Sequence, residues 1–173
     1  MGADPAGRLG GAPPGGFPFG IGSAEGCWVT GTDGRKYLDW MAGIGVLNTG
    51  HRHPRVMAAI GAQAGRHLHA MVYGEWAQEA QSALADRLCG LVPVDDPRVF
   101  FTTSGAEAVE GALKAARRAT GRGKIAAFEG SYHGSTFGAL AVTGNGGMRA
   151  PLEPLLPGVS FMPYGDPDAL GAV

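Results

Sequence analysis

The sequence predicts an α/β protein in which a mostly parallel sheet with flanking helices follows an N-terminal hairpin segment. Two observations support this fold class. Apolar strand-like runs at 98–102 and 124–128 bracket a strongly helical run at 106–117, and strand, helix and strand in close succession are typical of a parallel βαβ unit. An Asp33-Gly34 turn between two short β-prone runs predicts a hairpin nearer the start of the chain.

The composition is that of a globular protein and excludes several classes of partner. The chain has 173 residues, of which 45% are hydrophobic and 17% charged, with a formal net charge of −1. This near-neutral charge gives no electrostatic reason to expect nucleic acid or a membrane surface as partner. Cys27 and Cys89 have neither metal-ligand nor disulfide-framework spacing. No signal peptide or membrane-spanning run is recognised, so we expect a cytoplasmic protein.

Three segments are expected along the chain. Residues 1–24 are rich in Gly and Pro, which supply little to bury, and are interpreted as a flexible tail. Residues 25–70 contain the predicted hairpin and a helix that begins at Pro54, a residue favoured at helix starts. Residues 71–173 are expected to hold the sheet-containing domain, which opens with a helix over 76–91. A further strand is expected over 159–162.

The most informative segment is the turn between the predicted strand at 98–102 and the helix that follows it. A helix that starts directly after a buried strand points free backbone N–H groups, and the positive end of its dipole, toward the carboxyl edge of the sheet, which creates an anion site. Thr103 or Ser104 can cap the helix and offer a hydroxyl. Gly105 has no side chain to keep an anion from the backbone. A plain helix cap is the alternative, and these residues alone favour it.

Tyr132 follows the next predicted strand, 124–128, and is therefore expected at the same edge of the sheet. An aromatic ring beside a phosphate site can stack on a flat heteroaromatic cofactor, although core packing would use the same residue. Ligands of open α/β sheets gather at the carboxyl ends of the strands. The two features together therefore indicate a cofactor site more strongly than either one alone.

Four ordered blocks of the sequence resemble the class III, or ω-type, aminotransferases, which belong to the fold-type-I pyridoxal-phosphate enzymes. The blocks are residues 33–39, 43–46 with 50–54, 101–110, and 131–134. The resemblance extends from about residue 25 to the end of the chain. It is nearest to the acetylornithine, succinylornithine and 4-aminobutyrate aminotransferases. It implies the first part of the large domain of these enzymes, and a homodimer for the complete enzyme.

The resemblance also implies roles for individual residues in binding pyridoxal 5'-phosphate. Gly105 and Ala106 would give their backbone N–H groups to the phosphate, with Ser104 beside them. Tyr132 would cover one face of the pyridine ring, and His133 would lie close behind it. These five residues are the cofactor-binding residues that the sequence predicts.

Position 135 departs from the family pattern. The family usually carries an arginine there, which pairs with a substrate carboxylate, whereas this chain has Ser135. A hydroxyl cannot make the bidentate, charge-assisted contact of a guanidinium. The expected substrates are an amine or amino acid and a 2-oxo acid, and either another residue binds the carboxylate or the substrate differs from the usual amino acids.

No catalytic residue is expected within the chain. Transamination needs a Schiff-base lysine and an acidic residue at the pyridine nitrogen, and in the family both lie downstream, beyond Val173. The three lysines here, Lys36, Lys114 and Lys124, lie in motifs where the family uses them structurally. The chain is therefore interpreted as an N-terminal fragment that is inactive by itself. A non-catalytic truncated paralogue or binding partner, and a mutase or decarboxylase of the same fold type, stay open as alternatives.

Two other groups of residues have spacings that could form sites. Two histidine pairs have the alternate spacing of strand-borne metal ligands, but no cysteine or carboxylate completes either set, so no metal is expected; they are His51 with His53 and His67 with His69. Glu107 and Glu110 lie one turn apart on the predicted helix. A solvated first turn stabilised by the helix dipole is their expected role.

Overall fold

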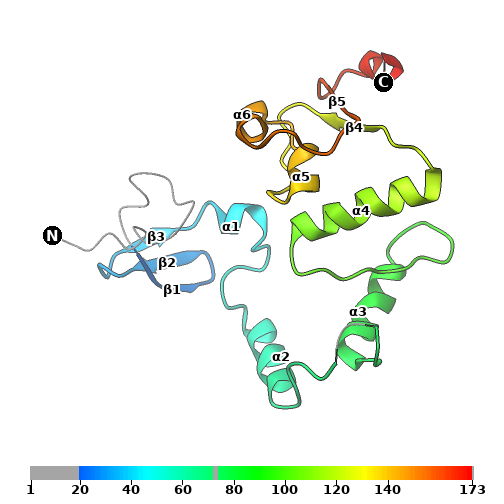
Figure 1. Cartoon of the computed structure of the whole chain (residues 1–173). Coiled ribbons are helices and arrows are strands. Elements are labelled where there is room, and N and C mark those ends of the chain that lie inside the picture. Colours follow the sequence, from blue (N-terminus) through cyan, green and yellow to red (C-terminus); the bar gives the residue numbers. More distant parts are fainter. Residues whose placement is uncertain (1–19, 72–73, 173) are drawn as a thin grey trace. The chain divides into compact units, whose positions relative to one another are not determined.

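A computed structural model describes residues 20–71 and 74–172 (Figure 1). The chain divides into an N-terminal unit, Met1–Trp76, and a C-terminal unit, Ala77–Val173. This division lies close to the boundary predicted after residue 70. Each unit is described by itself. Among the described residues, no helix has the length and apolar character needed to cross a bilayer.

The N-terminal unit begins with an antiparallel sheet of three strands in the order β1 (Ile21–Glu25), β2 (Trp28–Gly31) and β3 (Lys36–Leu38). The predicted hairpin is confirmed, because β2 pairs with β3 across the turn that contains Asp33. The Asp33 carboxylate accepts hydrogen bonds from the Arg35 N–H and the Tyr37 hydroxyl, each at 3.0 Å, and so closes the turn. These bonds, the Arg35 N–H first, lower the pKa of Asp33.

The interpretation of residues 1–24 as a tail extends too far along the chain. Residues 21–24 belong to β1 and pair with β2. Composition misled the prediction because a Gly-containing segment can still form a strand when a neighbouring strand supplies the hydrogen-bonding partner. Residues 1–19 of the predicted tail lie outside the described residues.

Two short helical elements complete the N-terminal unit. The segment α1 (Ala42–Gly45) is a distorted turn, since Ala42, Gly43, Ile44 and Gly45 all have positive φ angles, between 45° and 79°. The helix α2 (Pro54–Ala64) starts at Pro54, as predicted, and ends at Gly65.

The C-terminal unit contains the remaining elements: α3 (Glu79–Cys89), α4 (Gly105–Thr120), β4 (Ile125–Phe128), α5 (Phe137–Ala141), α6 (Gly146–Arg149), η1 (Ala150–Leu152), β5 (Val159–Met162) and η2 (Asp168–Ala172). The strands β4 and β5 lie side by side and pair in parallel, from Ile125 opposite Val159 to Phe128 opposite Met162 (Figure 1). The expected parallel sheet, and the expected strand over 159–162, are confirmed.

Two predicted elements differ from the structure. Residues 98–102 are not assigned to a strand, because a strand is defined by its ladder and the ladders of the described residues join β1 to β2, β2 to β3 and β4 to β5. The parallel pair is therefore formed by β4 and β5, and not by residues 98–102 and 124–128 as predicted. The helix expected over 76–91 is shorter and begins at Glu79.

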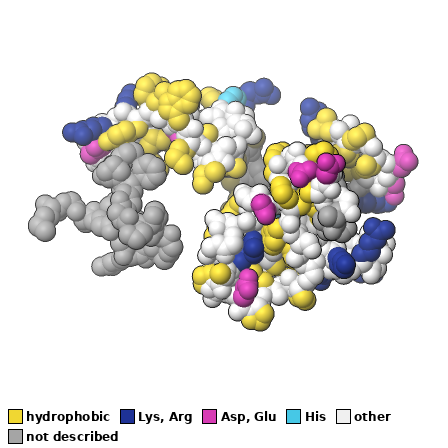
Figure 2. Space-filling view, turned by 90° about the horizontal axis from the view of Figure 1, so that it is seen from above, with side chains coloured by type: hydrophobic (Ala, Val, Ile, Leu, Met, Phe, Trp, Pro, Cys, Tyr) yellow, Lys and Arg dark blue, Asp and Glu magenta, His cyan; other side chains and the backbone are white. Residues whose placement is uncertain are grey.

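The core of the C-terminal unit surrounds β4, β5 and α5. Its buried residues are Ala127, Ala139, Leu140, Ala141, Val142, Thr143 and Met162. Several large apolar side chains of the same unit stay exposed, such as Leu91 at 70% and Phe100 at 71%. Hydrophobic side chains are correspondingly visible on the surface in Figure 2.

Candidate functional site

The first turn of α4 is closed by reciprocal hydrogen bonds. Ser104 is the N-cap, and its Oγ accepts a hydrogen bond of 3.2 Å from the Glu107 N–H. The Glu107 carboxylate returns to accept bonds from the N–H and the hydroxyl of Thr103. This is a capping box shifted by one residue at its return contact. The Thr103 hydroxyl is the main cause of the lowered pKa of Glu107.

The cap leaves two amides of α4 available to a ligand. Within the described residues, the backbone N–H groups of Gly105 and Ala106 have no hydrogen-bond acceptor, as is usual for the first turn of a helix. A Cβ placed on Gly105 would meet no heavy atom within 4 Å, so the backbone there faces open space. The Ser104 oxygen accepts a bond while its hydrogen stays free to donate. Two amides, one hydroxyl and the helix dipole together fit an anion such as a phosphate.

The loop between β4 and α5 follows a fixed course. The Gly144 N–H donates to the Ser131 backbone oxygen at 2.8 Å, and the Ser131 hydroxyl donates to the Phe128 oxygen at 2.7 Å. The His133 N–H donates to the hydroxyl of Thr143, a residue with no exposed surface. A Cβ on Gly144 would lie 2.2 Å from the Phe128 oxygen. The close approach of two backbone segments therefore sets the path of the loop.

The same loop lies against the start of α4. A Cβ on Gly134 would come within 2.6 Å of the Ala106 Cβ, so the Gly134 backbone packs directly on the first turn of the helix. The loop that carries Tyr132 and His133 is thereby brought to the end of α4 where the free amides lie. The start of α4 and the loop after β4 therefore lie next to each other, although, among the described residues, no strand directly precedes α4.

The predicted ring-stacking residues occupy different surroundings. The Tyr132 side chain is 65% exposed, which argues against the alternative that it packs in the core. Its hydroxyl lies 3.3 Å from the Ser135 hydroxyl. His133 lines a cavity of about 590 Å³ whose walls include Val109 of α4 and Phe128 of β4. The ring of Tyr132 is thus available to a ligand, whereas His133 is part of the wall of the cavity that Val109 and Phe128 also line.

Glu110 departs from the role expected for it. Its Oε1 accepts hydrogen bonds from the Thr136 hydroxyl at 2.7 Å and from the N–H groups of Gly138 and Ala139 at 2.9 and 3.2 Å. The expectation of a solvated side chain is wrong for this residue, because its carboxylate accepts hydrogen bonds from backbone N–H groups in the first turn of α5. These bonds, the one from Thr136 above all, lower the pKa of Glu110. The sequence did not predict this role, because the residues around Glu110 give no indication of which distant N–H groups its side chain accepts hydrogen bonds from.

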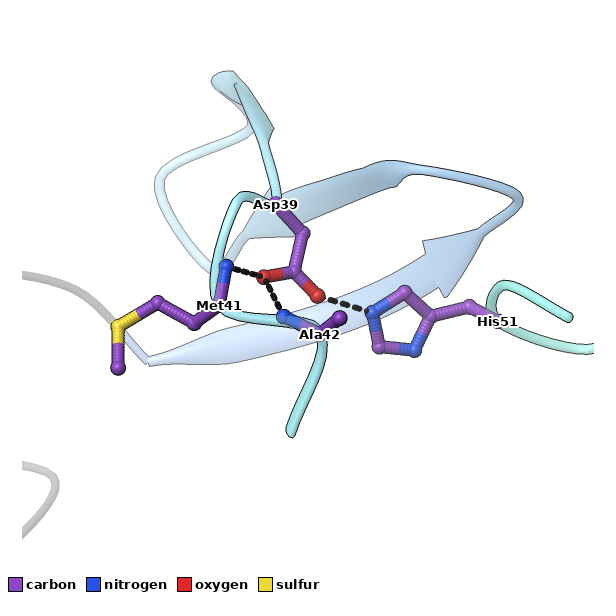
Figure 3. Close-up of polar contacts among 4 residues, drawn as sticks. All are labelled: Asp39, Met41, Ala42 and His51. Atoms are coloured by element: carbon purple, nitrogen blue, oxygen red, sulfur yellow. Dashed lines mark hydrogen bonds and ion pairs between the residues drawn. The ribbon is translucent and has the colours of Figure 1, made fainter. Parts of the chain in front are cut away.

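A second polar cluster lies in the N-terminal unit (Figure 3). Asp39 Oδ2 lies 2.7 Å from His51 Nε2, and Asp39 Oδ1 accepts bonds of 2.9 Å from the N–H groups of Met41 and Ala42. The side chains of Asp39 and His51 are only 14% and 22% exposed. The hydrogen bond to His51 is the first cause of the lowered pKa of Asp39. The cluster fixes the start and end of the distorted segment around α1.

The histidines weighed as metal ligands do not converge with other ligands. Within the described ranges, no three His, Cys, Asp or Glu side chains are placed to hold a metal ion. His51 binds Asp39, as described above, while the His67 Nε2 lies 3.3 Å from the Gln63 amide nitrogen. Both contacts are hydrogen bonds, the first between residues 12 apart in the sequence and the second between residues four apart.

Comparison with known proteins identifies the family. The model of the family described as aminotransferase class-III matches residues 13–172. A diaminobutyrate–2-oxoglutarate aminotransferase of Haemophilus influenzae is 45% identical over 86% of this chain and 33% of its own length. An acetylornithine aminotransferase of Mycolicibacterium smegmatis is 46% identical over 90% of this chain and 39% of its own length. The chain thus spans a third to two fifths of the curated relatives it matches.

The solved structures that resemble this chain are also aminotransferases. The taurine:2-oxoglutarate aminotransferase of Bifidobacterium kashiwanohense, solved with pyridoxal phosphate and glutamate, superposes with a TM-score of 0.79 at 36% identity, over 86% of this chain and 33% of that one. An amine transaminase of an uncultivated Pseudomonas species, in its pyridoxal-phosphate-bound form, gives a TM-score of 0.80 at 31% identity, over 91% and 38%. The fold at this site is therefore that of the aminotransferase large domain in its first part.

Proposed function

The chain belongs to the class-III aminotransferases, and we propose that it forms part of a pyridoxal-phosphate-dependent transaminase, which transfers an amino group between an amine or amino acid and a 2-oxo acid. The observation that carries this proposal is the pair of free N–H groups at Gly105 and Ala106, with the loop of Tyr132 packed beside them. The relatives named above are all aminotransferases, which favours amino-group transfer over a mutase or decarboxylase reaction.

The residues present fit the cofactor. The Gly105 and Ala106 amides and the Ser104 hydroxyl are donors for the phosphate, placed where the helix dipole favours negative charge. The exposed ring of Tyr132 supplies an apolar face for the pyridine ring. We propose that His133 lies close behind Tyr132. When bound, the cofactor supplies the electron sink that amino-group transfer requires.

Position 135 bears on the choice of amino donor. Ser135 is uncharged, and its hydroxyl lies 3.3 Å from that of Tyr132. We propose that this position binds no substrate carboxylate by charge pairing, since a hydroxyl lacks the two parallel donors of a guanidinium. Donors that present an amine away from their acid group, such as the diaminobutyrate and taurine named for the relatives, are the proposed substrate class.

The complete protein is proposed to be a cytoplasmic homodimer. Three apolar side chains around α1 are strongly exposed: Trp40 at 87%, Ile44 at 85% and Val46 at 73%. A second subunit that covered them would remove this surface from water. Cys27 and Cys89 are free thiols, which is the usual state of cysteine in the cytoplasm.

A donor screen on the product of the complete reading frame tests the proposed function. Reading the gene beyond codon 173 first establishes whether an Asp and a Lys in family contexts follow. The purified product is then incubated with 2-oxoglutarate and one donor at a time: diaminobutyrate, acetylornithine, taurine or a simple amine. We expect glutamate to form with at least one ω-amino donor. Release of carbon dioxide without glutamate would indicate a decarboxylase, and no turnover in a protein that carries both residues would refute the proposal.

A further inference from the structure

Glu110 connects the two halves of the proposed cofactor site. It lies on α4, the helix whose first turn presents the Gly105 and Ala106 amides. Its Oε1 accepts three hydrogen bonds, from the Thr136 hydroxyl and from the Gly138 and Ala139 N–H groups, which belong to the end of the Tyr132 loop and the first turn of α5. One carboxylate oxygen therefore joins the phosphate-binding helix to the ring-binding loop.

The loop depends on this contact because α5 supplies no cap of its own. Thr136 is the N-cap of α5, but its hydroxyl makes no capping bond within α5 and donates instead to Glu110. The first N–H groups of a helix need an external acceptor, and here the acceptor comes from α4. The fit is close, since a Cβ on Gly138 would lie 2.3 Å from Glu110 Oε2.

The other end of the loop is anchored independently. The Ser131 and His133 backbones are tied to Gly144 and Thr143. Tyr132 therefore lies between two residues that are both attached to the core, and Glu110 attaches the end of the same loop, from Thr136 onward, to α4. Between these anchors, Gly134 packs on Ala106. Release of the Glu110 anchor would free the segment from α4 without disturbing its attachment to the core.

We propose that Glu110 is a positioning residue that holds the Tyr132 ring in register with the phosphate-binding amides of α4. The inference rests on the proposed function, because it concerns the same site. Glu110 does not touch the ligand, and its effect passes through Thr136 and the backbone of the loop. Three donors on one oxygen favour an anion strongly, since hydrogen bonds to a charged acceptor are the stronger kind. The pKa of Glu110 is lowered, first by the Thr136 hydrogen bond, which agrees with a carboxylate that these donors stabilise.

The test compares two probes on the 173-residue chain. Inorganic phosphate reports the amides alone, and pyridoxamine phosphate reports the amides together with the ring. Affinities are read from the amide shifts of Gly105 and Ala106 in ¹⁵N spectra. In the wild type, pyridoxamine phosphate is expected to bind more tightly than inorganic phosphate by about tenfold, the scale of an aromatic stacking contact. In E110A this ratio is expected to fall to about one while the affinity for inorganic phosphate stays unchanged.

Three further variants make the result specific. E110Q keeps an oxygen in place to accept the bonds, and is expected to restore most of the wild-type ratio. T136V removes one donor and is expected to lower the ratio by a smaller factor. E129A removes an exposed carboxylate just before the loop that makes no side-chain hydrogen bond within the described residues, and is expected to keep the wild-type ratio.

The outcomes separate the inference from the proposed function. If the wild type binds pyridoxamine phosphate no more tightly than inorganic phosphate, or binds neither, the cofactor assignment fails and the inference fails with it. If the wild type has the expected preference and E110A retains it, the inference alone is overturned. If E110A does not fold, T136V decides: a lowered ratio supports the positioning role, and an unchanged ratio overturns it.

Discussion

Gly144 is a position at which a single methyl group should damage the candidate site. A Cβ on Gly144 would lie 2.2 Å from the Phe128 oxygen and 2.5 and 2.6 Å from the backbone nitrogens of Gly130 and Ser131. All three neighbours are backbone atoms, so no side chain can rotate away. The Gly144→Ala substitution must therefore separate the loop after β4 from the chain that passes beneath it.

The magnitude follows from the contacts that separate. Overpacking of this kind costs about 1–3 kcal/mol. Moving the chains apart also weakens the bonds from the Gly144 N–H to the Ser131 backbone oxygen and to its Oγ, at 2.8 and 3.1 Å, each with a net value of about 1 kcal/mol. We expect Gly144→Ala to lower the free energy of unfolding of the C-terminal unit by about 3–5 kcal/mol.

Urea unfolding, followed by the intensity of the Leu140 amide resonance in ¹⁵N spectra, measures this change within the C-terminal unit. Gly123→Ala is the matched control, because a Cβ there meets no heavy atom within 4 Å and the φ angle is not left-handed. The control is expected to change the free energy of unfolding by less than about 1 kcal/mol. A Gly144→Ala chain as stable as the control would refute the claim that close backbone contact determines the loop.

Two further predictions concern the hydrogen bonds at helix ends and turns. Ser104→Ala removes the N-cap oxygen that accepts from the Glu107 N–H and should destabilise the C-terminal unit by about 1 kcal/mol in the same urea assay; a change in the opposite direction would contradict the assigned cap. Asp39 has a lowered pKa in the folded chain, first because of its hydrogen bond with His51. Its contribution to stability is complete above its ordinary pKa of 3.8 and is lost as the pH falls through the lowered folded-state value. Asp39→Asn should therefore reduce the loss of stability of the N-terminal unit on acidification, as followed by the Trp28 and Trp40 fluorescence, and an acid transition identical to that of wild type would count against this role.

Local sequence patterns predicted the elements that carry their own signals. Asp33 and Gly34 favour a turn wherever they occur between β-prone runs, and the hairpin is present. Pro54 is compatible with the first turn of a helix and with few other helical positions, and α2 starts there.

The predictions that were wrong, and the contacts that were not predicted, involve residues that are far apart in the sequence. Ile21 begins a strand because β2 lies beside it, although its neighbours have the composition of a tail. Residues 98–102 have the apolar character of a strand, but they form none in the structure. Glu110 has the sequence context of a solvated helical residue, yet it caps α5. Composition and periodicity describe one segment of the chain at a time. They do not predict these features, because each depends on a contact, or the lack of one, between two segments.

In the candidate site, too, roles that depend on local sequence were predicted and roles that depend on distant contacts were not. Ser104 was predicted as a possible cap because its residue type and position suffice for that role, and it is the N-cap of α4. Thr143 was not singled out, although its buried hydroxyl accepts from the His133 N–H and donates to the Ala139 oxygen. A single threonine in a loop carries no local signal of such a role. The two contacts appear only when the loop and α5 are folded together.

The central claim is that the Gly105 and Ala106 amides bind the phosphate of the cofactor with Tyr132 over its ring. Titration of the ¹⁵N-labelled chain with pyridoxamine phosphate tests it most directly, with unphosphorylated pyridoxamine as the control. The account predicts that these two amide resonances shift most, in saturable fashion, together with the Tyr132 ring resonances, and that the control leaves the amides unmoved. Equal shifts with the control, or shifts confined to other parts of the chain, would contradict it.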